Sequence, residues 1–409
     1  MISSPQSLRV AVVASSLRRA GAEKQTFYQA RALHRAGIAV RFFQLGGDGP
    51  YAAVLRQAGV PLCRIYLPNQ PGVMLAKLIG NLRRWRPQIV LAAQFGDLRF
   101  GAVAGRLCRA LVLGGVRSDG FYELNTYGCF GRWMARLAHG LVANSDRARQ
   151  NLVSRGIPPK KIVVLPNVID LPEFDQRMAQ PPELSLPPDR LVVAAVGSLH
   201  PCKRFDRFLE ALALARRREP KLAGVLAGAD CGAKADLQAK ANALGLTAND
   251  IFFPGEVGNV PALLARSAML ALTSDYEGFP NVILEAMAAR LPVLSVPAGD
   301  ADSIVQNGTT GHIVAADDIQ NLAACMVQLA QSPAMRLNLG EAGRKRVGQE
   351  YNGESLADRL AMIFHGFAGQ NHRHALCELL ERGVNAASPR NVAGTLAPGP
   401  GVNTALLGS

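Results

Sequence analysis

Two glutamates separated by seven residues stand in segment 274–288, which reads SDYEGFPNVILEAMA. Glu277 precedes a turn, and Glu285 follows it within an apolar run that predicts a helix beginning near Asn281. The N–H groups and the positive dipole end at such a helix start favour an anion, so a phosphate-bearing ligand fits here. Glu285, about one turn inside the helix, is placed to accept hydrogen bonds from ribose hydroxyls, and Glu277 from sugar hydroxyls.

The turn between the two glutamates supplies further candidate contacts to this phosphate-bearing ligand, the expected donor. Gly278 lets the backbone approach a ligand closely, and Pro280 suits a helix start. The candidate donor-binding residues of this segment, besides Glu285, are Gly278, Phe279, Pro280 and Asn281. A lone glutamate in a loop or in a first helical turn is an ordinary feature, so the interpretation depends on the whole string.

A second group of candidates follows the predicted strand 191–196. Lys203 lies just beyond this strand, where its ammonium group is placed to neutralise a phosphate-bearing ligand. Gly197, Ser198 and Arg204 stand in the same loop as candidate donor contacts. The alternative interpretation of Lys203 is a solvated loop lysine.

Candidates in the first half of the chain follow other predicted strands. Gly21 lies in the first strand-to-helix loop, where the absence of a side chain lets the backbone reach donor phosphates; the alternative is a simple turn glycine. Arg117 and Asp119 stand in GVRSDG after the predicted strand 110–116. They are candidate contacts to an acceptor or to the transferred sugar, and the alternative is an ion pair within the loop.

The elements that must position these residues alternate between short apolar strands and longer helical patterns. The helices expected first cover 24–36 and 51–58. The expected strands are 8–14, 39–45, 89–93, 110–116, 140–143 and 162–165, then 191–196, 221–227, 251–254, 269–273, 292–296 and 311–314. Such alternation predicts an α/β chain with two Rossmann-like, doubly wound domains that face a central cleft.

The domain boundaries follow from composition. The Pro-rich stretch 180–188 predicts a linker between a first domain, 1–180, and a second domain, 181–352. A helix at 353–368 is expected to pack back on the first domain. Residues 369–409, rich in Ala, Gly, Pro and Asn, are expected to form a flexible tail that contains one short amphipathic helix at 375–382.

Composition limits the classes of function. The chain has 409 residues and a formal net charge of +14, which attracts phosphates, nucleic acid or an anionic membrane surface without choosing among them. Its seven cysteines include no CxxC pair, so neither zinc nor a disulfide framework is indicated. The first residues read as a β-strand rather than a signal peptide, and no apolar run is long enough to span a bilayer, which predicts a cytoplasmic protein.

The ordered set of motifs resembles family 4 of the retaining GT-B glycosyltransferases over roughly residues 8–365. The matching strings, in order, are AGAE from Ala20, ANS from Ala143, LPNVID from Leu165, VGSLHPCK from Val196, FPG from Phe253 and the two spaced glutamates. The resemblance implies that a nucleotide-sugar is the donor and that Lys203, which neutralises the departing diphosphate, and Glu277 act in catalysis. It also implies that domain 1–180 lies on the acceptor side and that domain 181–352 binds the nucleotide-sugar. The family usually has an arginine where Ser198 stands and an acid where Ser303 stands, so this chain departs from the pattern twice.

The resemblance further implies a hexosyltransferase that retains configuration by a front-face reaction without a protein nucleophile, with a UDP- or GDP-sugar as substrate. The expected acceptor is a glycan or a lipid-linked saccharide, in cell-surface polysaccharide or lipopolysaccharide synthesis, with the protein peripheral on the inner face of an anionic membrane. No cofactor, metal or nucleic acid is expected, because no DxD-type acidic pair lies on the donor loop. The alternatives are an inactive binder of nucleotide-sugars or proteins, a GT-B epimerase, and a nicotinamide dehydrogenase, which the missing GxGxxG spacing disfavours.

Overall fold

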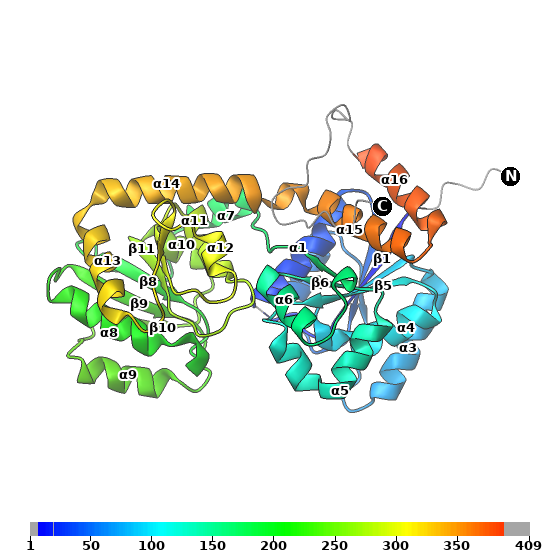
Figure 1. Cartoon of the computed structure of the whole chain (residues 1–409), viewed down its shortest axis with the longest axis horizontal. Helices are drawn as coiled ribbons and strands as arrows, with labels where there is room; N and C mark the ends of the chain where they lie inside the picture. The colour runs from blue at the N-terminus through cyan, green and yellow to red at the C-terminus, as the bar shows by residue number, and fades with distance from the viewer. Residues whose placement is uncertain (1–6, 19, 388–409) are drawn as a thin grey trace. The chain divides into compact units, whose positions relative to one another are not determined.

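The computed structural model describes residues 7–18 and 20–387, with side chains to residue 381. The chain divides into two compact units. The N-terminal unit comprises Met1–Val168 and Gly353–Ser409, and the C-terminal unit comprises Ile169–Asn352 (Figure 1). Each unit is a parallel sheet with helices on both of its faces, so the prediction of two doubly wound α/β domains is confirmed.

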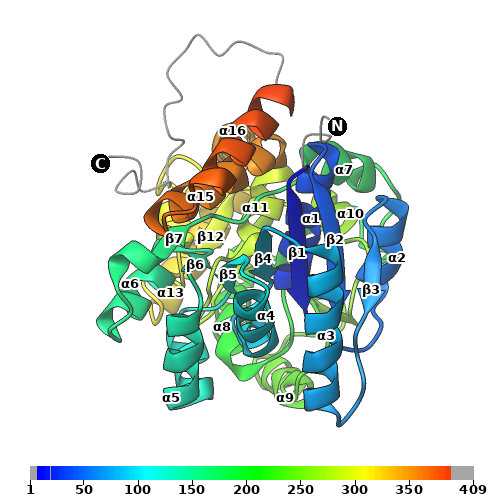
Figure 2. The same cartoon turned by 90° about the vertical axis from the view of Figure 1, so that its right-hand side faces the viewer.

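The sheet of the N-terminal unit has seven parallel strands in the order β3-β2-β1-β4-β5-β6-β7 (Figure 2). The strands are β1 (Arg9–Ala14), β2 (Ala39–Gln44), β3 (Leu62–Arg64), β4 (Ile89–Ala92), β5 (Leu111–Val116), β6 (Gly140–Ala143) and β7 (Ile162–Val164). The helices among them are α1 (Gly21–Arg35), α2 (Pro50–Gln57), α3 (Pro71–Trp85), α4 (Leu98–Leu107), α5 (Phe121–Leu137) and α6 (Asp146–Ser154), with 3₁₀ turns η1 (Phe95–Asp97) and η2 (Pro159–Lys161). The central strands are continuous apolar runs because helices cover both faces.

The sheet of the C-terminal unit has six parallel strands in the order β10-β9-β8-β11-β12-β13. The strands are β8 (Leu191–Val196), β9 (Leu222–Ala227), β10 (Ile251–Gly255), β11 (Met269–Leu272), β12 (Val293–Ser295) and β13 (Gly311–Ile313). The helical elements are α7 (Leu171–Met178), η3 (Pro201–Lys203), α8 (Phe205–Arg216), α9 (Lys234–Ala243), α10 (Val260–Ala265), α11 (Asn281–Ala288), α12 (Ala301–Ile304), α13 (Ile319–Gln331) and α14 (Pro333–Glu350). All the expected strands are present, and short β3 is the one strand of the described chain that the sequence did not predict.

The boundary between the units differs from the predicted one. The chain passes into the C-terminal unit at Ile169, so α7 and the stretch 180–188 belong to that unit and do not form a linker. Arg177 of α7 donates to the carbonyl oxygen of Gly258 at 2.7 Å. Leu184 and Leu186 pack against the face of β8 and β9. Composition alone misled here, because prolines also occur in segments that pack on a domain surface.

The end of the described chain is helical, which corrects the expected flexible tail. After 3₁₀ turn η4 (Gly353–Ser355), α15 (Leu356–Gln370) packs against α1, and α16 (His374–Ala387) packs against α15 (Figures 1 and 2). Leu376 and Leu380 of α16 are buried in the same core as the strands of the N-terminal unit. The expected helix 375–382 is therefore longer and docked. The rest of the expected tail lies outside the described residues.

Candidate active site

The strand order of the C-terminal unit reverses between β8 and β11. Ligands of doubly wound sheets bind beyond the carboxyl ends of the strands at such a point. Gly197 directly follows β8, and Thr273 directly follows β11. The two loops predicted to hold a donor therefore start from neighbouring strands.

An ion pair joins the two residues expected in catalysis. Lys203 Nζ lies 2.7 Å from Glu277 Oε1, and Ser274 Oγ donates to the same oxygen at 2.7 Å. The side chains of Lys203 and Glu277 are 22% and 13% exposed, so both are half-buried and still reachable from solvent. The sequence placed Lys203 and Glu277 in separate loops, and the structure brings them together through Ser274, which the sequence analysis did not single out.

Backbone contacts hold the Lys203 loop against the Glu277 loop. Thr273 Oγ1 donates to the carbonyl oxygen of Lys203 at 3.1 Å, and Asp275 N donates to that of Cys202 at 2.9 Å. Lys203 ends η3, and only Arg204 separates it from α8. The ammonium group is thus held at the switch point of the sheet, where a diphosphate would need a cation.

Helix α11 begins where the sequence predicted, with Pro280 at its N-cap and Asn281 as its first residue. Glu285 is half-buried in the second turn of the helix. Phe279 is buried, with its ring 5.9 Å from that of Tyr351. The Phe279 side chain therefore anchors the turn in the core, and a donor contact from this residue is left to its backbone.

Arg204 does not stand free to replace the missing family arginine. Its guanidinium lies 3.0 Å from Asp206 and 3.3 Å from Asp275, and these carboxylates raise the pKa of Arg204. Buried Arg207 bonds Asp275 as well, at 2.5 Å. Ser198 is exposed. Lys203 is thus the cation that pairs with Glu277, and Arg207 is a structural anchor that the sequence analysis did not identify.

Two glycines that the sequence analysis passed over shape this site. Gly299 has φ +59, and an added Cβ would lie 2.7 Å from the carbonyl oxygen of Glu277 and 2.8 Å from that of Gly278. Gly228 similarly leaves room for the carbonyl group of Gly197. The loops after β12 and β9 therefore pack backbone to backbone on the two donor loops. Only residues without side chains permit this approach.

The candidates of the N-terminal unit lie at the carboxyl edge of its own sheet. Gly21 is the first residue of α1 rather than a loop residue. Arg117 follows β5; its Nε donates to the carbonyl oxygen of Ala93 at 3.3 Å and its Nη2 to Gln29 Oε1 at 3.2 Å. Asp119 accepts from the N–H of Tyr122 at 2.8 Å and so caps the start of α5.

Arg117 and Asp119 therefore engage different groups, and the alternative of an ion pair within their loop is not what the structure has. Both acceptors of the Arg117 guanidinium, the carbonyl oxygen of Ala93 and the amide oxygen of Gln29, are neutral. Burial lowers the pKa of Arg117 to about 10. A desolvated cation with neutral acceptors is a favourable contact for an anionic or hydroxyl-rich ligand.

Buried Asp97 is the other group at this edge that the sequence analysis missed. Its carboxylate accepts from Ser15 N at 3.0 Å and from Gln94 N at 3.1 Å, and so joins the loops after β1 and β4. Burial raises the pKa of Asp97 to about 6. An acid four residues after the expected strand 89–93 was the available signal.

Neither a metal cluster nor a membrane span occurs in the described part of the chain. Among residues 7–18 and 20–387, no three His, Cys, Asp or Glu side chains converge as metal ligands. Within the same residues, no helix has the length and apolar character needed to cross a membrane.

Two family models and several known proteins are similar to this chain. Residues 176–346 match the family model described as glycosyl transferases group 1, and residues 19–173 match that of glycosyltransferase family 4. A D-inositol 3-phosphate glycosyltransferase of Mycolicibacterium paratuberculosis is 32% identical over 198 residues, covering 47% of this chain and 45% of that protein. An N-acetyl-alpha-D-glucosaminyl L-malate synthase of Bacillus anthracis is 30% identical over 115 residues, 28% of this chain and 30% of that protein. The matched segment thus spans less than half the length of these relatives.

Solved structures share the fold. HepE of Anabaena, crystallised with UDP and glucose, superposes with a TM-score of 0.75 at 20% identity, covering 87% of this chain and 99% of that one. The lipopolysaccharide outer core galactosyltransferase WaaB superposes with a TM-score of 0.66 at 17% identity, with coverage of 87% and 99%. Together with the two family models, which cover both units in order, these likenesses show that the chain belongs to the family 4 glycosyltransferases of the GT-B fold.

Proposed function

We propose that the protein transfers a hexose from a nucleotide-sugar to a hydroxyl acceptor with retention of configuration. The observation that carries this proposal is the Lys203–Glu277 pair at the switch point of the C-terminal sheet, directly before the helix that bears Glu285. The two family models, which match residues 19–173 and 176–346, are both described as glycosyltransferases. HepE crystals with UDP and with UDP-glucose favour a UDP-sugar as the donor.

Each residue of the pair has a role in this proposal. Lys203 and the N-terminus of α11 neutralise the donor diphosphate as it leaves, an electrostatic effect that acts most strongly on the charge developed in the transition state. Glu285 accepts hydrogen bonds from the ribose, and Glu277 accepts from a sugar hydroxyl. The reaction needs no protein nucleophile, since the leaving phosphate takes the proton of the acceptor hydroxyl on the same face of the sugar. The chain contributes position and charge.

The acceptor is proposed to meet the N-terminal unit at Arg117, with Asp119 beside it. Arg117 is suited to a phosphate, carboxylate or hydroxyl group because the two acceptors of its guanidinium are neutral. Asp119 is the weaker candidate, since one of its oxygens caps α5. A lipid-linked saccharide or glycan in cell-surface polysaccharide or lipopolysaccharide synthesis fits such a site, and the likeness to WaaB supports this setting. The protein would then work at the inner face of an anionic membrane.

A second candidate function is a nucleotide-sugar binder without transferase activity. It is favoured by serine at position 198, where the family usually has a second cation, and by the commitment of Arg204 to Asp206 and Asp275. Ser303, where the family often has an acid, lies in the short helix α12. The two candidates share a donor site and differ in turnover.

Binding and turnover are therefore measured separately. Calorimetric titration with UDP, GDP and ADP tests the donor site, with Lys203→Ala and Glu285→Ala as variants. Lys221→Ala and Glu256→Ala are matched controls, because both residues are exposed and lie in the same unit. One nucleotide family should bind the parent chain and both controls, and binding should weaken in both site variants. If no nucleotide binds, or if the controls lose as much affinity as the site variants, the proposed donor site is wrong.

Turnover is followed by incubating the preferred nucleotide-sugar with a mixture of glycan and lipid-linked acceptors and measuring nucleotide release. Proton NMR of the product reports the anomeric configuration, which should match that of the donor. Inversion would refute the front-face reaction and leave glycosyl transfer standing. Tight nucleotide binding together with no release above that of Lys203→Ala would favour the inactive binder.

A further inference from the structure

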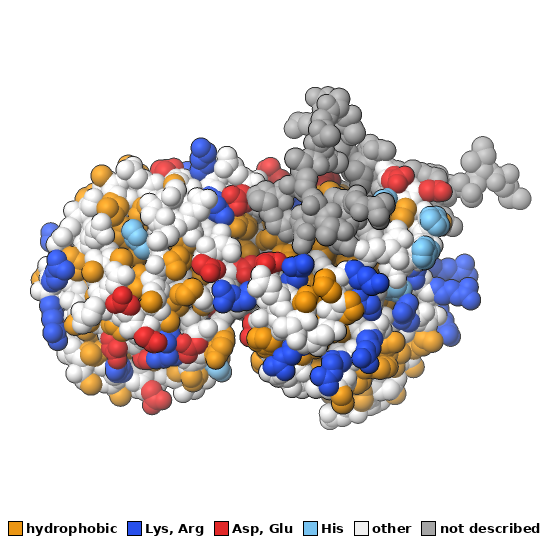
Figure 3. Space-filling view, viewed as in Figure 1, with side chains coloured by type: hydrophobic (Ala, Val, Ile, Leu, Met, Phe, Trp, Pro, Cys, Tyr) orange, Lys and Arg blue, Asp and Glu red, His pale blue; other side chains and the backbone are white. Residues whose placement is uncertain are grey.

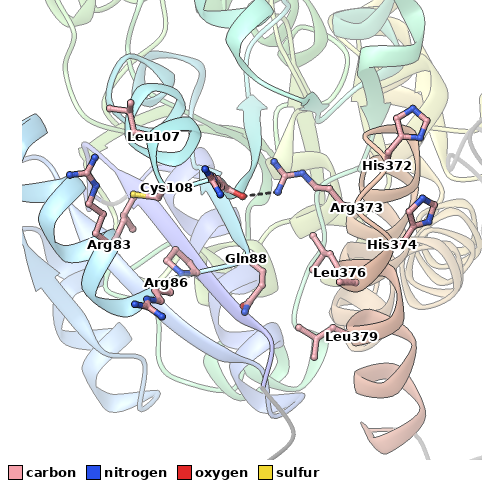
Figure 4. A pocket seen from close by; sticks show the side chains of 14 residues that line it. Arg83, Arg86, Gln88, Leu107, Cys108, His372, Arg373, His374, Leu376 and Leu379 are labelled. Atoms are coloured by element: carbon pink, nitrogen blue, oxygen red, sulfur yellow. Dashed lines mark hydrogen bonds between the residues drawn. The ribbon is translucent and has the colours of Figure 1, made fainter. Parts of the chain in front are cut away.

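A basic groove lies in the N-terminal unit at the edge of the sheet opposite to Gly21 and Arg117. It has a volume of about 1040 Å³ and is bounded by the ends of α3 and α4 and by the start of α16. Residues 86–88 lead into β4, and Arg109 precedes β5, so the groove faces the amino ends of these strands. Figure 4 shows Arg83 and Arg86 on one side of the groove and His372, Arg373 and His374 on the other. The site is thus separate from the proposed acceptor contacts.

The positive charge in this groove is uncompensated. None of the described residues that line it is an aspartate or a glutamate. Arg83, Arg86 and Arg109 are exposed, and among the described side chains none forms a hydrogen bond or ion pair with theirs. Arg373, by contrast, holds the groove together by donating to the carbonyl oxygen of Arg109 at 2.7 Å. Three guanidinium groups are therefore available to bind an anion from outside the chain.

Buried His139 lies behind the groove and is affected by the same positive charge. Its Nε2 lies 3.3 Å from Arg373 Nη2 and 2.7 Å from Arg106 Nη1. Burial, together with Arg106, Arg373 and Lys161, lowers the pKa of His139 to about 4. The ring stays neutral near pH 7, because a further cation would be unfavourable there.

The backbone gives an independent sign of function. Arg86, Arg109 and His372 have φ of 53°, 57° and 54°, in the left-handed region that glycine adopts more easily. All three lie at the ends of helices, where glycine is the usual residue. After four other helices this chain does use glycine there: Gly37, Gly59, Gly156 and Gly245. Arg290 occupies the same place after α11, but it pairs with Glu341.

Strained residues that converge on one site point to a role for their side chains. A basic side chain near a helix C-terminus also interacts favourably with the dipole, which accounts for a cation in general. The dipole does not account for two strained arginines and a strained histidine around one groove. The groove therefore keeps arginine and histidine where glycine would fold more easily.

The charge of the whole unit favours the same kind of partner. The N-terminal unit has 28 Lys and Arg against 10 Asp and Glu, whereas the C-terminal unit has 17 against 21. The basic excess of the chain thus lies entirely in one unit, and Figure 3 shows basic side chains spread over its surface. Leu107, which is 55% exposed, adds an apolar contact at the groove. Phosphate beside apolar surface is the chemistry of an anionic lipid.

We propose that this groove binds the phosphate headgroups of anionic lipids and holds the N-terminal unit on a membrane surface. The inference rests on the proposed function only in that a lipid-linked acceptor brings the protein to a membrane surface. A soluble phosphate compound is the competing source of the same chemistry, and the apolar rim favours the lipid.

The test replaces two strained arginines by the residue their backbone favours. Arg86→Gly with Arg109→Gly should keep the melting temperature or raise it, because glycine relieves the left-handed conformation. Binding to phosphatidylcholine vesicles that contain phosphatidylglycerol, measured by cosedimentation at low salt, should weaken by about 30-fold, since each arginine near an anionic surface contributes about fivefold. Arg217→Ser with Arg218→Ser removes two exposed charges from the C-terminal unit and should leave vesicle binding unchanged.

Three outcomes would overturn the proposal. The first is that the parent chain does not bind the anionic vesicles. The second is that the two double variants lose equal affinity for the vesicles. The third is that inorganic phosphate and glycerol phosphate bind the groove as tightly as vesicles do, which would make it a site for soluble phosphates. UDP titration of the same samples tests the proposed donor site separately from vesicle binding. Loss of vesicle binding with UDP binding intact supports the groove, and absence of UDP binding in the parent chain refutes the donor site without touching the groove.

Discussion

Glu277→Gln is predicted to strengthen the binding of UDP while it weakens sugar transfer. In the structure the Glu277 carboxylate holds Lys203 at 2.7 Å. A diphosphate that binds to Lys203 must share this cation or displace the carboxylate from it. Glutamine keeps the size of the side chain and can still accept the hydrogen bond from Ser274, but it carries no charge, so the competition is removed.

The magnitude follows from the partial burial of the pair. A hydrogen bond between charged groups contributes roughly 1.5–3 kcal/mol, and exposed ion pairs contribute at most about 1 kcal/mol. Side chains that are 22% and 13% exposed fall between these limits, and glutamine retains part of the contact. We therefore expect a gain of about 1 kcal/mol, or roughly a fivefold lower Kd for UDP. Lys203→Ala should raise the Kd by about 10-fold or more, because it removes the cation itself.

Isothermal titration of UDP into the parent chain and both variants measures these values, and kcat/KM with the full donor measures transfer. Glu256→Gln is the matched control, since this exposed glutamate lies in the same unit. The reasoning fails if Glu277→Gln weakens UDP binding as Lys203→Ala does. That result would mean that the carboxylate orients Lys203 for the diphosphate and does not compete for it.

Three further changes test other parts of the structure. Ser198→Arg restores the cation usual in the family and should raise kcat/KM by about tenfold, the equivalent of one moderate charged hydrogen bond; no gain would show that this loop does not reach the leaving group. Gly299→Ala should lower the stability of the C-terminal unit by roughly 2 kcal/mol in urea denaturation, because it adds left-handed strain and places Cβ against the carbonyl oxygen of Glu277; an unchanged midpoint would contradict the packing. Asp97 has a pKa raised from 3.8 to about 6, so the folded state binds the proton more tightly than the unfolded state does. The free energy of unfolding of the N-terminal unit should therefore fall as pH rises from about 4 to about 6. Asp97→Asn should remove this slope in paired urea denaturations, and an equal slope in both proteins would refute the assignment.

The sequence predicted the elements well because the strands of parallel sheets are buried on both faces. Such strands read as apolar runs with helices between them, and the strand Gly140–Ala143 was predicted to the residue. The strand Leu62–Arg64 was missed because it is only three residues long and partly exposed at the edge of its sheet. The ending of the first domain was misplaced for a different reason. Only tertiary packing shows that α7 belongs to the second sheet.

The candidate site was predictable where it is local in sequence. Segment 274–288 carries its helix start, its turn and its two glutamates together, so a short pattern was enough. The pairing of Lys203 with Glu277 spans 74 positions and depends on β8 and β11 lying side by side. The approach of Gly299 to the Glu277 loop depends on β12 in the same way. The neutral surroundings of Arg117 likewise come from β4 and α1, which no motif around this residue encodes.

The separation of charge between the units leads to a last prediction, on salt. The C-terminal unit has more acidic than basic residues, yet it is the unit proposed to bind a diphosphate. The attraction must therefore come from Lys203 and the start of α11 at short range, which salt screens weakly in a half-buried site. The groove of the N-terminal unit instead acts through exposed arginines over a longer range. Raising the ionic strength from about 0.01 M to about 0.15 M shortens the Debye length from about 30 Å to about 8 Å, so vesicle binding should fall steeply while the Kd for UDP changes several-fold at most. If UDP binding falls as steeply as vesicle binding, the donor is drawn by the general charge of the protein and not by the local pair of Lys203 and the helix.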